Sequence, residues 1–167
     1  MFVEQTLPKN RSEETTMSLE KYKSKRKFGE TSEPEGEIKK SGKELIYVIQ
    51  KHQAKKLHWD LRLERNGVLK SWAVPKEPPT KEGERRLAVA VEDHPVDYSS
   101  FEGAIPEGQY GTGTVEIWDG GTYEAMKWKD NEIIIDIHGN KLKGKYVLIK
   151  TKFGGSKNSW LFFKKKQ

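Results

Sequence analysis

The sequence predicts a mainly β protein: a compact closed or nearly closed β-barrel of about eight strands, with one short N-terminal helix and an N-terminal arm. From residue 45 onward, short apolar runs alternate with turn residues, which is typical of strands. Most of these runs are linked by hairpin-like turns, and almost no stretch has a helical period. A β-sandwich also has many short strands, but consecutive hairpins favour a barrel.

The chain before the first strand is expected to contribute little to the core. The first forty residues carry few apolar side chains and many of Glu, Lys, Ser and Thr, and we expect residues 1–17 to be a disordered tail. Residues 18–44 are expected to form a short helix, with Leu19 and Tyr22 on one side, and then an arm containing Gly, Pro and Glu. Residues 45–167 then make up the barrel domain.

The barrel strands are the apolar runs between turn signals. Asn66-Gly67 is the strongest hairpin signal in the chain, and Gly120-Gly121 is expected to form a second hairpin. The expected strands are Leu45–Gln50, Leu57–Glu64, Val68–Val74, Leu87–Asp93, Thr114–Asp119, Thr122–Met126, Glu132–His138, Lys145–Thr151 and Ser159–Lys164.

Composition limits the partners and the metal chemistry. The 31 Lys and Arg against 25 Asp and Glu give a net charge of +6, which favours a polyanionic partner without establishing one. Because there is no cysteine, any metal must be held by His, Asp or Glu. The sequence has no signal peptide and no span long enough for a membrane, so we expect a cytoplasmic protein that does not act at a membrane. We also expect a monomer.

Residues 57–64, LHWDLRLE, alternate strictly between apolar and polar side chains. In a strand, His58, Asp60 and Arg62 therefore share one face. His58 and Asp60 are metal-ligand types, and Arg62 is the side chain best shaped to hold a phosphate. His52 lies close enough to join as a third ligand. The alternative is a solvated strand face with a chance His and Asp.

Two further strands add candidate residues. The strand LKSWAVPK ends at Lys76 and carries Trp72 on the same face, either in the core or over the cluster. The strand RLAVAVEDHP has Arg86, Glu92 and His94 on one face. Its opposite, apolar face is expected to hold Leu87, Val89 and Val91.

These residue types suggest a division of roles for phosphate-ester chemistry. Arg62, Lys76 and Arg86 would neutralise the phosphate, and His94 would donate a proton to the leaving oxygen. Glu92 would orient an arginine or a metal-bound water. The alternatives are a structural His before a turn and an ordinary salt-bridge Glu. Two imidazoles with one carboxylate suit Mn²⁺, Co²⁺ or Zn²⁺ better than Mg²⁺.

Three segments carry a resemblance to a known family. They are YVIQKHQAKKLHWDLRLERNGVLKSWAVPK, RLAVAVEDHPVDY and FEGAIPEGQYGTGTVEIWDGGTY. They resemble the 3′-phosphoesterase domain of bacterial DNA ligase D, which is also found as a stand-alone protein. The resemblance implies a manganese-dependent β-barrel enzyme of DNA break repair. Such an enzyme removes a 3′-terminal ribonucleoside and then hydrolyses the remaining 3′-phosphate to a 3′-hydroxyl.

The resemblance also implies roles for individual residues. His52, His58 and Asp60 match the metal ligands. The match to the phosphate-binding set covers Arg62, Lys76, Arg86 and His94, supported by Glu92 and Tyr98. In the arm, the segment RKFGETSEP matches one in which an arginine and a glutamate reach the site, here Arg26 and Glu33. The family often has an acidic residue directly after that arginine, whereas this chain has Lys27.

The expected substrates are the 3′ ends of DNA or DNA–RNA primer-templates. The chain has no adenylating-lysine motif and no room for a polymerase, so a separate ligase and polymerase are expected to act in trans. Two other functions fit the same residues: a non-catalytic barrel that binds nucleic-acid ends, and a general metal phosphatase acting on small molecules.

Overall fold

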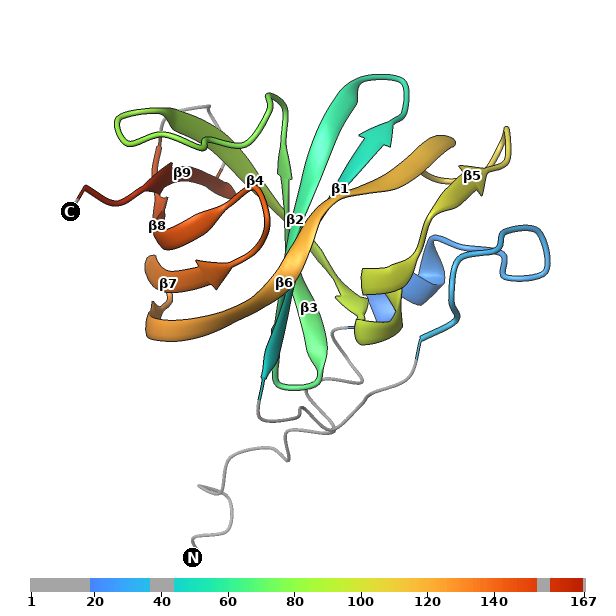
Figure 1. Ribbon diagram of the computed structural model, residues 1–167. Coiled ribbons are helices and arrows are strands. Elements are labelled where there is room, and N and C mark those ends of the chain that lie inside the picture. The colour runs from blue at the N-terminus through green and yellow to red at the C-terminus, as the bar shows by residue number, and fades with distance from the viewer. Residues whose placement is uncertain (1–18, 37–43, 153–156, 167) are drawn as a thin grey trace, which may run out of the picture.

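A computed structural model describes residues 19–36, 44–152 and 157–166, and these residues form an antiparallel β-barrel behind a short N-terminal helix at residues 19–24 (Figure 1). The predicted tail at residues 1–17 lies outside the described residues. No helix among the described residues is long and apolar enough to cross a membrane. The strands are β1 (Leu45–Gln53), β2 (Leu57–Arg65), β3 (Val68–Val74), β4 (Arg85–Pro95), β5 (Gly103–Ile105), β6 (Gly113–Lys129), β7 (Glu132–His138), β8 (Lys143–Lys150) and β9 (Ser159–Lys164), and the 3₁₀ helix η2 spans Val96–Ser100.

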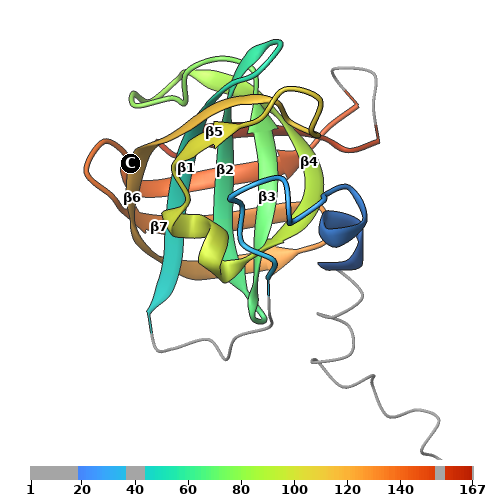
Figure 2. The same cartoon turned by 90° about the vertical axis from the view of Figure 1, so that its right-hand side faces the viewer.

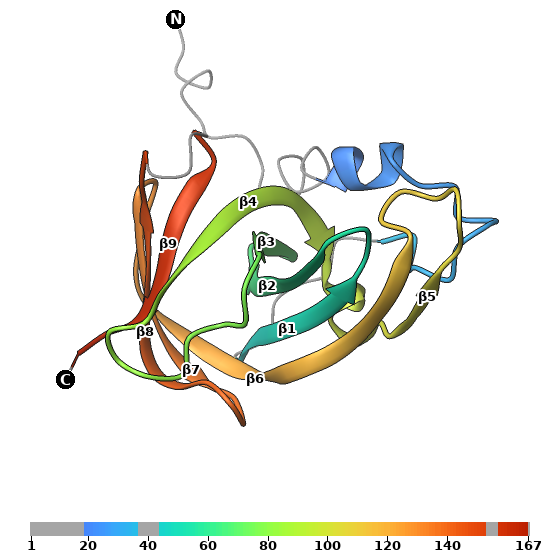
Figure 3. The same ribbon diagram turned by 90° about the horizontal axis from the view of Figure 1, so that it is seen from above.

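The predicted barrel closure is confirmed. The strand order is β1-β2-β3-β4-β9-β8-β7-β6-β5, and an additional pairing of β1 with β6 closes eight of these strands into a ring. Strand β5 pairs only with β6 and lies outside the ring, as the view in Figure 3 shows. Every pairing between these strands is antiparallel.

The prediction of a hairpin at Gly120-Gly121 is wrong. Both glycines lie inside β6, where Gly120 pairs with Val48 and Gly121 with Tyr47. A Cβ atom on Gly121 would lie 2.1 Å from the carbonyl oxygen of His138. The glycine therefore allows close approach of a neighbouring backbone within a long, bent strand, which is the other common reason for glycine in a strand.

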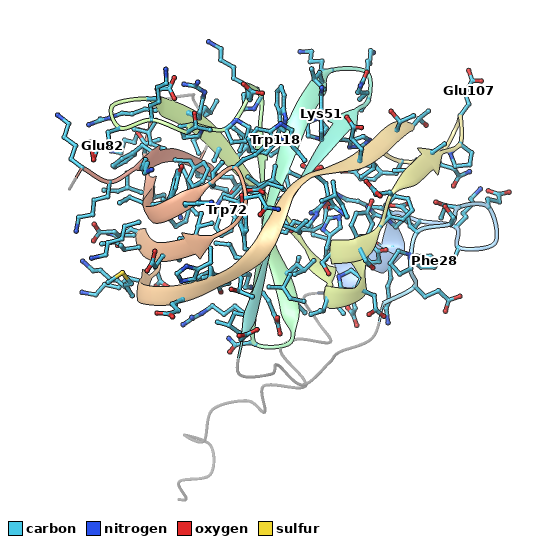
Figure 4. The ribbon with its side chains drawn as sticks, in the orientation of Figure 1. Phe28, Lys51, Trp72, Glu82, Glu107 and Trp118 are labelled. Atoms are coloured by element: carbon cyan, nitrogen blue, oxygen red, sulfur yellow. The ribbon has the colours of Figure 1, made fainter. Side chains whose placement is uncertain are left out.

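The barrel interior holds the main hydrophobic core. Of the alternatives for Trp72, the structure shows the core: its side chain is buried and packs against Trp128 and Trp160. Figure 4 shows Trp72 within the barrel and Phe28 on the side of the N-terminal arm. The apolar face of β2 contributes Trp59, Leu61 and Leu63 to the same core, as its alternation predicts.

A second hydrophobic cluster lies outside the barrel and attaches the arm to it. This cluster joins side chains of the arm, of η2 and of β5 to the outer surface of the sheet: Tyr22, Leu69, Tyr98, Phe101, Ile105 and Val115. In Figure 2 the arm passes in front of β2 and β3, on the side where η2 and β5 also lie. The polar face of β2 is consequently covered by protein instead of facing solvent.

Candidate metal and phosphate site

The polar face of β2 forms the floor of a pocket beneath the arm, with a volume of about 320 Å³. Asp60 and Arg62 on this floor are only 6% and 3% exposed. The alternative of a solvated strand face is therefore excluded. The pocket is lined by Arg26, His52, Ala54, His58, Asp60, Arg62, Ala73, Val91, Glu92, His94, Tyr98, Ile105, Tyr110 and Gly111.

The three predicted metal ligands converge in this pocket. His52 lies within β1, which runs to Gln53 instead of ending at Gln50, and His52 pairs directly with His58 of β2. His58 Nε2 is 3.3 Å from Asp60 Oδ1, and His52 Nδ1 is 3.7 Å from Asp60 Oδ2. One donor atom from each residue lies within 4.8 Å of the others, so these residues form a group that could hold a metal ion.

Backbone carbonyls define which nitrogen of each imidazole faces the carboxylate. His52 Nε2 donates to the Gly111 carbonyl at 2.7 Å, and His58 Nδ1 donates to the Lys56 carbonyl at 3.0 Å. Because a carbonyl can only accept, the nitrogen of each ring that could offer a lone pair to a cation is the one that faces Asp60. Two imidazole lone pairs aimed at a carboxylate suit a cation between them, and such outer hydrogen bonds commonly orient metal-binding histidines.

Arg62 is held in place from three directions. Its Nε donates to Gln50 Oε1 at 2.6 Å and its Nη1 to Ser71 Oγ at 2.9 Å, while Nη2 lies 3.4 Å from Asp60 Oδ2. Burial alone would raise the pKa of Asp60, but Arg62 and the neighbouring histidines outweigh it and hold this pKa well below its usual range. The carboxylate is therefore ionised and available to a cation.

The arm contributes a buried ion pair to the pocket. Glu33 Oε2 accepts hydrogen bonds from Arg26 Nε at 3.0 Å and from the Tyr98 hydroxyl at 2.6 Å. The Arg26 guanidinium lies 4.0 Å from the centroid of the Tyr22 ring, so Tyr22 of the N-terminal helix packs against it. Arg26 and Tyr98 line the pocket, whereas Glu33 does not line it and contacts both of these residues from behind. Lys27 is exposed.

His94 faces the pocket in a neutral state. Its Nδ1 donates to the Glu92 carbonyl at 3.0 Å, and its Nε2 faces Arg26 Nη2 at 3.4 Å. Burial, together with the positive charges of Arg62 and Arg26, lowers the pKa of His94 well below its ordinary value. In the free protein His94 is thus a hydrogen-bond acceptor toward the pocket, and proton donation requires that it first take up a proton.

Glu92 forms the salt bridge that the sequence left as its alternative role. Its Oε1 lies 2.6 Å from Lys25 Nζ on the N-terminal segment. Glu92 still lines the pocket, so it holds the N-terminal segment against β4 while its side chain stays at the candidate site.

The structure does not bring Lys76 and Arg86 to this pocket. Both line a separate pocket with Leu87 and Leu161, and Arg86 Nε donates to the Glu77 carbonyl at 2.7 Å. Their positions along the chain explain this. Lys76 lies an even number of residues from the core residues Trp72 and Val74, and Arg86 lies two residues from the core residue Ala88, so each is on the side of the chain that faces the barrel core. Phosphate binding by these two cations stays a prediction.

The prediction that Leu87, Val89 and Val91 form the core face of β4 is wrong. Ala88 is fully buried in the barrel core, while Val91 is 37% exposed and lines the candidate site. The pairing of β3 with β4 shifts register between Leu69 and Ser71. Such a bulge interrupts the two-residue alternation, so Ala88 points into the barrel core while His94 points into the candidate site.

Sequence reasoning missed several residues of the site. Gln50 is fully buried and accepts from Arg62, while its Nε2 donates to the Tyr98 and Phe101 carbonyls. Its only signal was its position two residues before His52 in the same strand. Tyr110 lines the pocket from the Gly-rich loop between β5 and β6, where its signal was a lone aromatic residue among glycines.

A second group of metal-ligand types lies on β6 and β7, at Glu124, Asp136 and His138. Its side chains are exposed or half-buried, and Lys145 pairs with Asp136 across the sheet. Exposure and a neighbouring cation make this group a weaker candidate than the buried one.

Comparison with known proteins matches the family described as the DNA Ligase D 3′-phosphoesterase domain over residues 50–150. The multifunctional non-homologous end joining protein LigD of Mycolicibacterium smegmatis is 49% identical over an alignment of 146 residues, and the match covers 80% of this chain and 19% of that protein. The LigD protein of Pseudomonas aeruginosa is 44% identical over an alignment of 155 residues, and the match covers 89% of this chain and 18% of that protein. The chain thus spans about a fifth of the length of these relatives.

Proposed function

Because the chain belongs to the family of the DNA ligase D 3′-phosphoesterase domain, we propose that it is a metal-dependent 3′-phosphoesterase that processes DNA ends during break repair by non-homologous end joining. Its substrates are the 3′ ends of DNA or DNA–RNA primer-templates. It removes a 3′-terminal ribonucleoside and then the 3′-phosphate, and it leaves a 3′-hydroxyl for a polymerase and a ligase to use.

The observation that carries this proposal is the single pocket that joins the His52, His58 and Asp60 group to two guanidiniums. The two buried carboxylates of Asp60 and Glu33 balance the charges of Arg62 and Arg26. A divalent cation would therefore make the pocket doubly positive, which suits a phosphate dianion. The imidazole and carboxylate donors favour Mn²⁺, with Co²⁺ or Zn²⁺ as alternatives. When bound, such a cation supplies Lewis-acid polarisation of a phosphoryl oxygen.

The protein's own groups position the phosphate. Arg62 has five N–H donors and directs two at Gln50 and Ser71, which leaves N–H groups on Nη1 and Nη2 for phosphate oxygens. Arg26 approaches from the arm and adds a second guanidinium. Rigid donors aimed at the oxygens, where negative charge develops during the reaction, are the usual source of rate in phosphoryl transfer.

His94 completes the set as the proton donor to the leaving oxygen. It is neutral in the free protein, and the negative charge of a bound phosphate next to it favours the protonated ring. In the monoesterase step, water forms a bond to phosphorus, the bond from phosphorus to O3′ breaks, and O3′ takes the proton. In the ribonucleoside step, the leaving oxygen is the 5′ oxygen of the terminal ribonucleoside.

The experiment is a 5′-labelled primer-template whose primer ends in one ribonucleotide, incubated with the protein and Mn²⁺ or with EDTA. We expect conversion first to a 3′-phosphate and then to a 3′-hydroxyl, only with the metal. A protein that shifts this substrate on a native gel without changing it would be a non-catalytic end-binding barrel.

A comparison with p-nitrophenyl phosphate separates the remaining alternative. A general small-molecule phosphatase would hydrolyse p-nitrophenyl phosphate with kcat/KM at least as high as that for the recessed 3′-phosphate. The proposed enzyme prefers the polynucleotide end, because binding of the strand outside the reacting phosphate contributes to transition-state stabilisation.

A further inference from the structure

A second pocket, of about 380 Å³, adjoins the candidate site and shares three lining residues with it: Val91, Glu92 and Tyr110. Ala90, Val91 and Glu92 of β4 line one side of it, and Lys21 and Lys25 of the N-terminal segment line another. We call it the adjoining pocket. A strand whose terminal phosphate occupies the first pocket can continue into the second, since the two share a wall.

Tyr110 stands at the boundary between the two pockets and is 49% exposed. The Arg26 guanidinium lies 5.5 Å from the centroid of its ring, so a ligand would reach the ring at the part that stays exposed. The carbonyl of the next residue, Gly111, accepts the hydrogen bond from His52. The backbone that carries Tyr110 is therefore tied to the metal-ligand group, although it lies on a loop.

The chemistry around the ring suits a nucleoside. Ala90 and the 37% exposed Val91 give the pocket apolar surface next to the ring. Lys25 Nζ lies 4.7 Å from the ring centroid and is already paired with Glu92. A base placed on Tyr110 would thus have an aromatic face and apolar neighbours. Aromatic side chains bind bases of any sequence in this way, because every base has a π face.

Lys21 supplies a positive charge at the far side of the adjoining pocket. It is exposed, and among the described residues no acidic side chain forms an ion pair with it. Lys23, on the same helix, is equally exposed but does not line the pocket. Lys21 therefore differs from Lys23 in its position at the pocket, and not in charge or exposure.

We propose that the adjoining pocket is a nucleotide subsite. It holds the nucleoside that carries the reacting 3′-phosphate, with its base stacked on Tyr110 and its 5′-phosphate at Lys21. This inference rests on the proposed function and deepens it: the subsite recognises the strand without reading its sequence, and it distinguishes a polynucleotide end from a small phosphate ester.

The test uses an oligonucleotide that ends in 2-aminopurine nucleoside 3′-phosphate, bound to the full chain in EDTA. Stacking on Tyr110 quenches 2-aminopurine fluorescence. We expect quenching by wild type and by Tyr110→Phe, which keeps the ring, and loss of quenching in Tyr110→Leu. Binding by Tyr110→Leu weakens about 5- to 150-fold, the loss typical of one base stack. Lys21→Ala weakens binding and lowers its salt dependence, while the matched Lys23→Ala behaves as wild type.

A kinetic readout separates this subsite from a structural role of the loop. With Mn²⁺, Tyr110→Leu is expected to lower kcat/KM for the oligonucleotide 3′-phosphate more than for p-nitrophenyl phosphate, and Tyr110→Phe restores the ratio. If wild type hydrolyses the 3′-phosphate while Tyr110→Leu keeps both quenching and this ratio, the subsite is refuted and the proposed function stands. If quenching depends on Tyr110 but wild type turns over no 3′ end, the subsite stands and the proposed function fails.

Discussion

Replacing Arg62 by lysine tests whether the guanidinium, and not merely its charge, organises the site. Arg62 Nε lies 2.6 Å from Gln50 Oε1, Nη1 lies 2.9 Å from Ser71 Oγ, and Nη2 lies 3.4 Å from Asp60 Oδ2. A lysine ammonium is a single point on a flexible stem. It cannot reach all three partners at once, so at least one buried acceptor loses a charged donor.

The size of the effect follows from these contacts. A hydrogen bond to a charged group contributes about 1.5–3 kcal/mol. Loss of one or two such bonds is expected to lower the free energy of unfolding by about 2–5 kcal/mol. In a domain of this size each kcal/mol lowers Tm by roughly 2–4 °C, so we expect a fall of roughly 5–20 °C. Activity with Mn²⁺ is expected to fall as well, because Asp60 and the phosphate lose a rigid partner.

The assay is thermal unfolding followed by the fluorescence of the five tryptophans, together with turnover of a 3′-phosphate. Arg65→Lys is the matched control: it lies on the same strand, is half-buried, and its guanidinium sits 4.3 Å from the centroid of the Trp128 ring. A lysine retains most of that cation–π contact, so the control costs less than about 1 kcal/mol. The reasoning is refuted if Arg62→Lys melts with wild type and keeps full Mn²⁺-dependent activity.

Four further outcomes are expected. His58→Ala and Asp60→Asn abolish metal-dependent turnover and the rise in Tm that Mn²⁺ gives wild type; retention of that rise would remove them from the metal site. The asparagine is preferred to Asp60→Ala, because it removes the charge but keeps an oxygen that can accept a hydrogen bond from the buried Arg62. Deleting residues 1–16 leaves kinetics unchanged, whereas deletion through Glu33 removes Arg26 and the buried Tyr22 and abolishes turnover; wild-type kinetics in the longer deletion would contradict the arm's role. His94→Ala lowers the ratio of activity on a 3′-phosphate to that on p-nitrophenyl phosphate by roughly 10²–10⁴-fold, because only the poor leaving group needs an acid; equal losses would mean that His94 only binds phosphate. His94 also makes stability depend on pH. Because burial and the two arginines lower its folded pKa below 6.5, the unfolded chain binds a proton as pH falls through 6.5 while the folded chain does not, so this contribution is present above pH 6.5 and is lost below it. In urea titrations wild type should therefore lose up to about 1.4 kcal/mol per pH unit relative to His94→Asn, and parallel curves would disprove the buried neutral state.

The local part of the site could be predicted from the sequence. In a strand, alternation alone determines that His58, Asp60 and Arg62 share a face and that Trp59, Leu61 and Leu63 share the other. The structure has both faces as predicted. The Asn66-Gly67 hairpin was equally local, and the turn joins β2 to β3, because two adjacent residues carry the backbone preference for the turn.

Only the tertiary structure decided what lies opposite that face. His52 reaches Asp60 because antiparallel register places it across from His58, and the arm covers the face through the Arg26–Glu33–Tyr98 hydrogen bonds. These contacts join residues far apart in sequence, so no local pattern encodes them.

The errors have the same origin. Lys76 and Arg86 were assigned to the polar face by counting in twos. Lys76, however, follows the end of β3 at a position in step with the core residues Trp72 and Val74, and a register shift separates the faces of Arg86 and His94 in β4. Gly120-Gly121 has the composition of a turn, yet the neighbouring strands extend β6 through it. Sequence period determines which side chains share a face of one strand, whereas pairing with other strands determines whether that face becomes core, solvent or site.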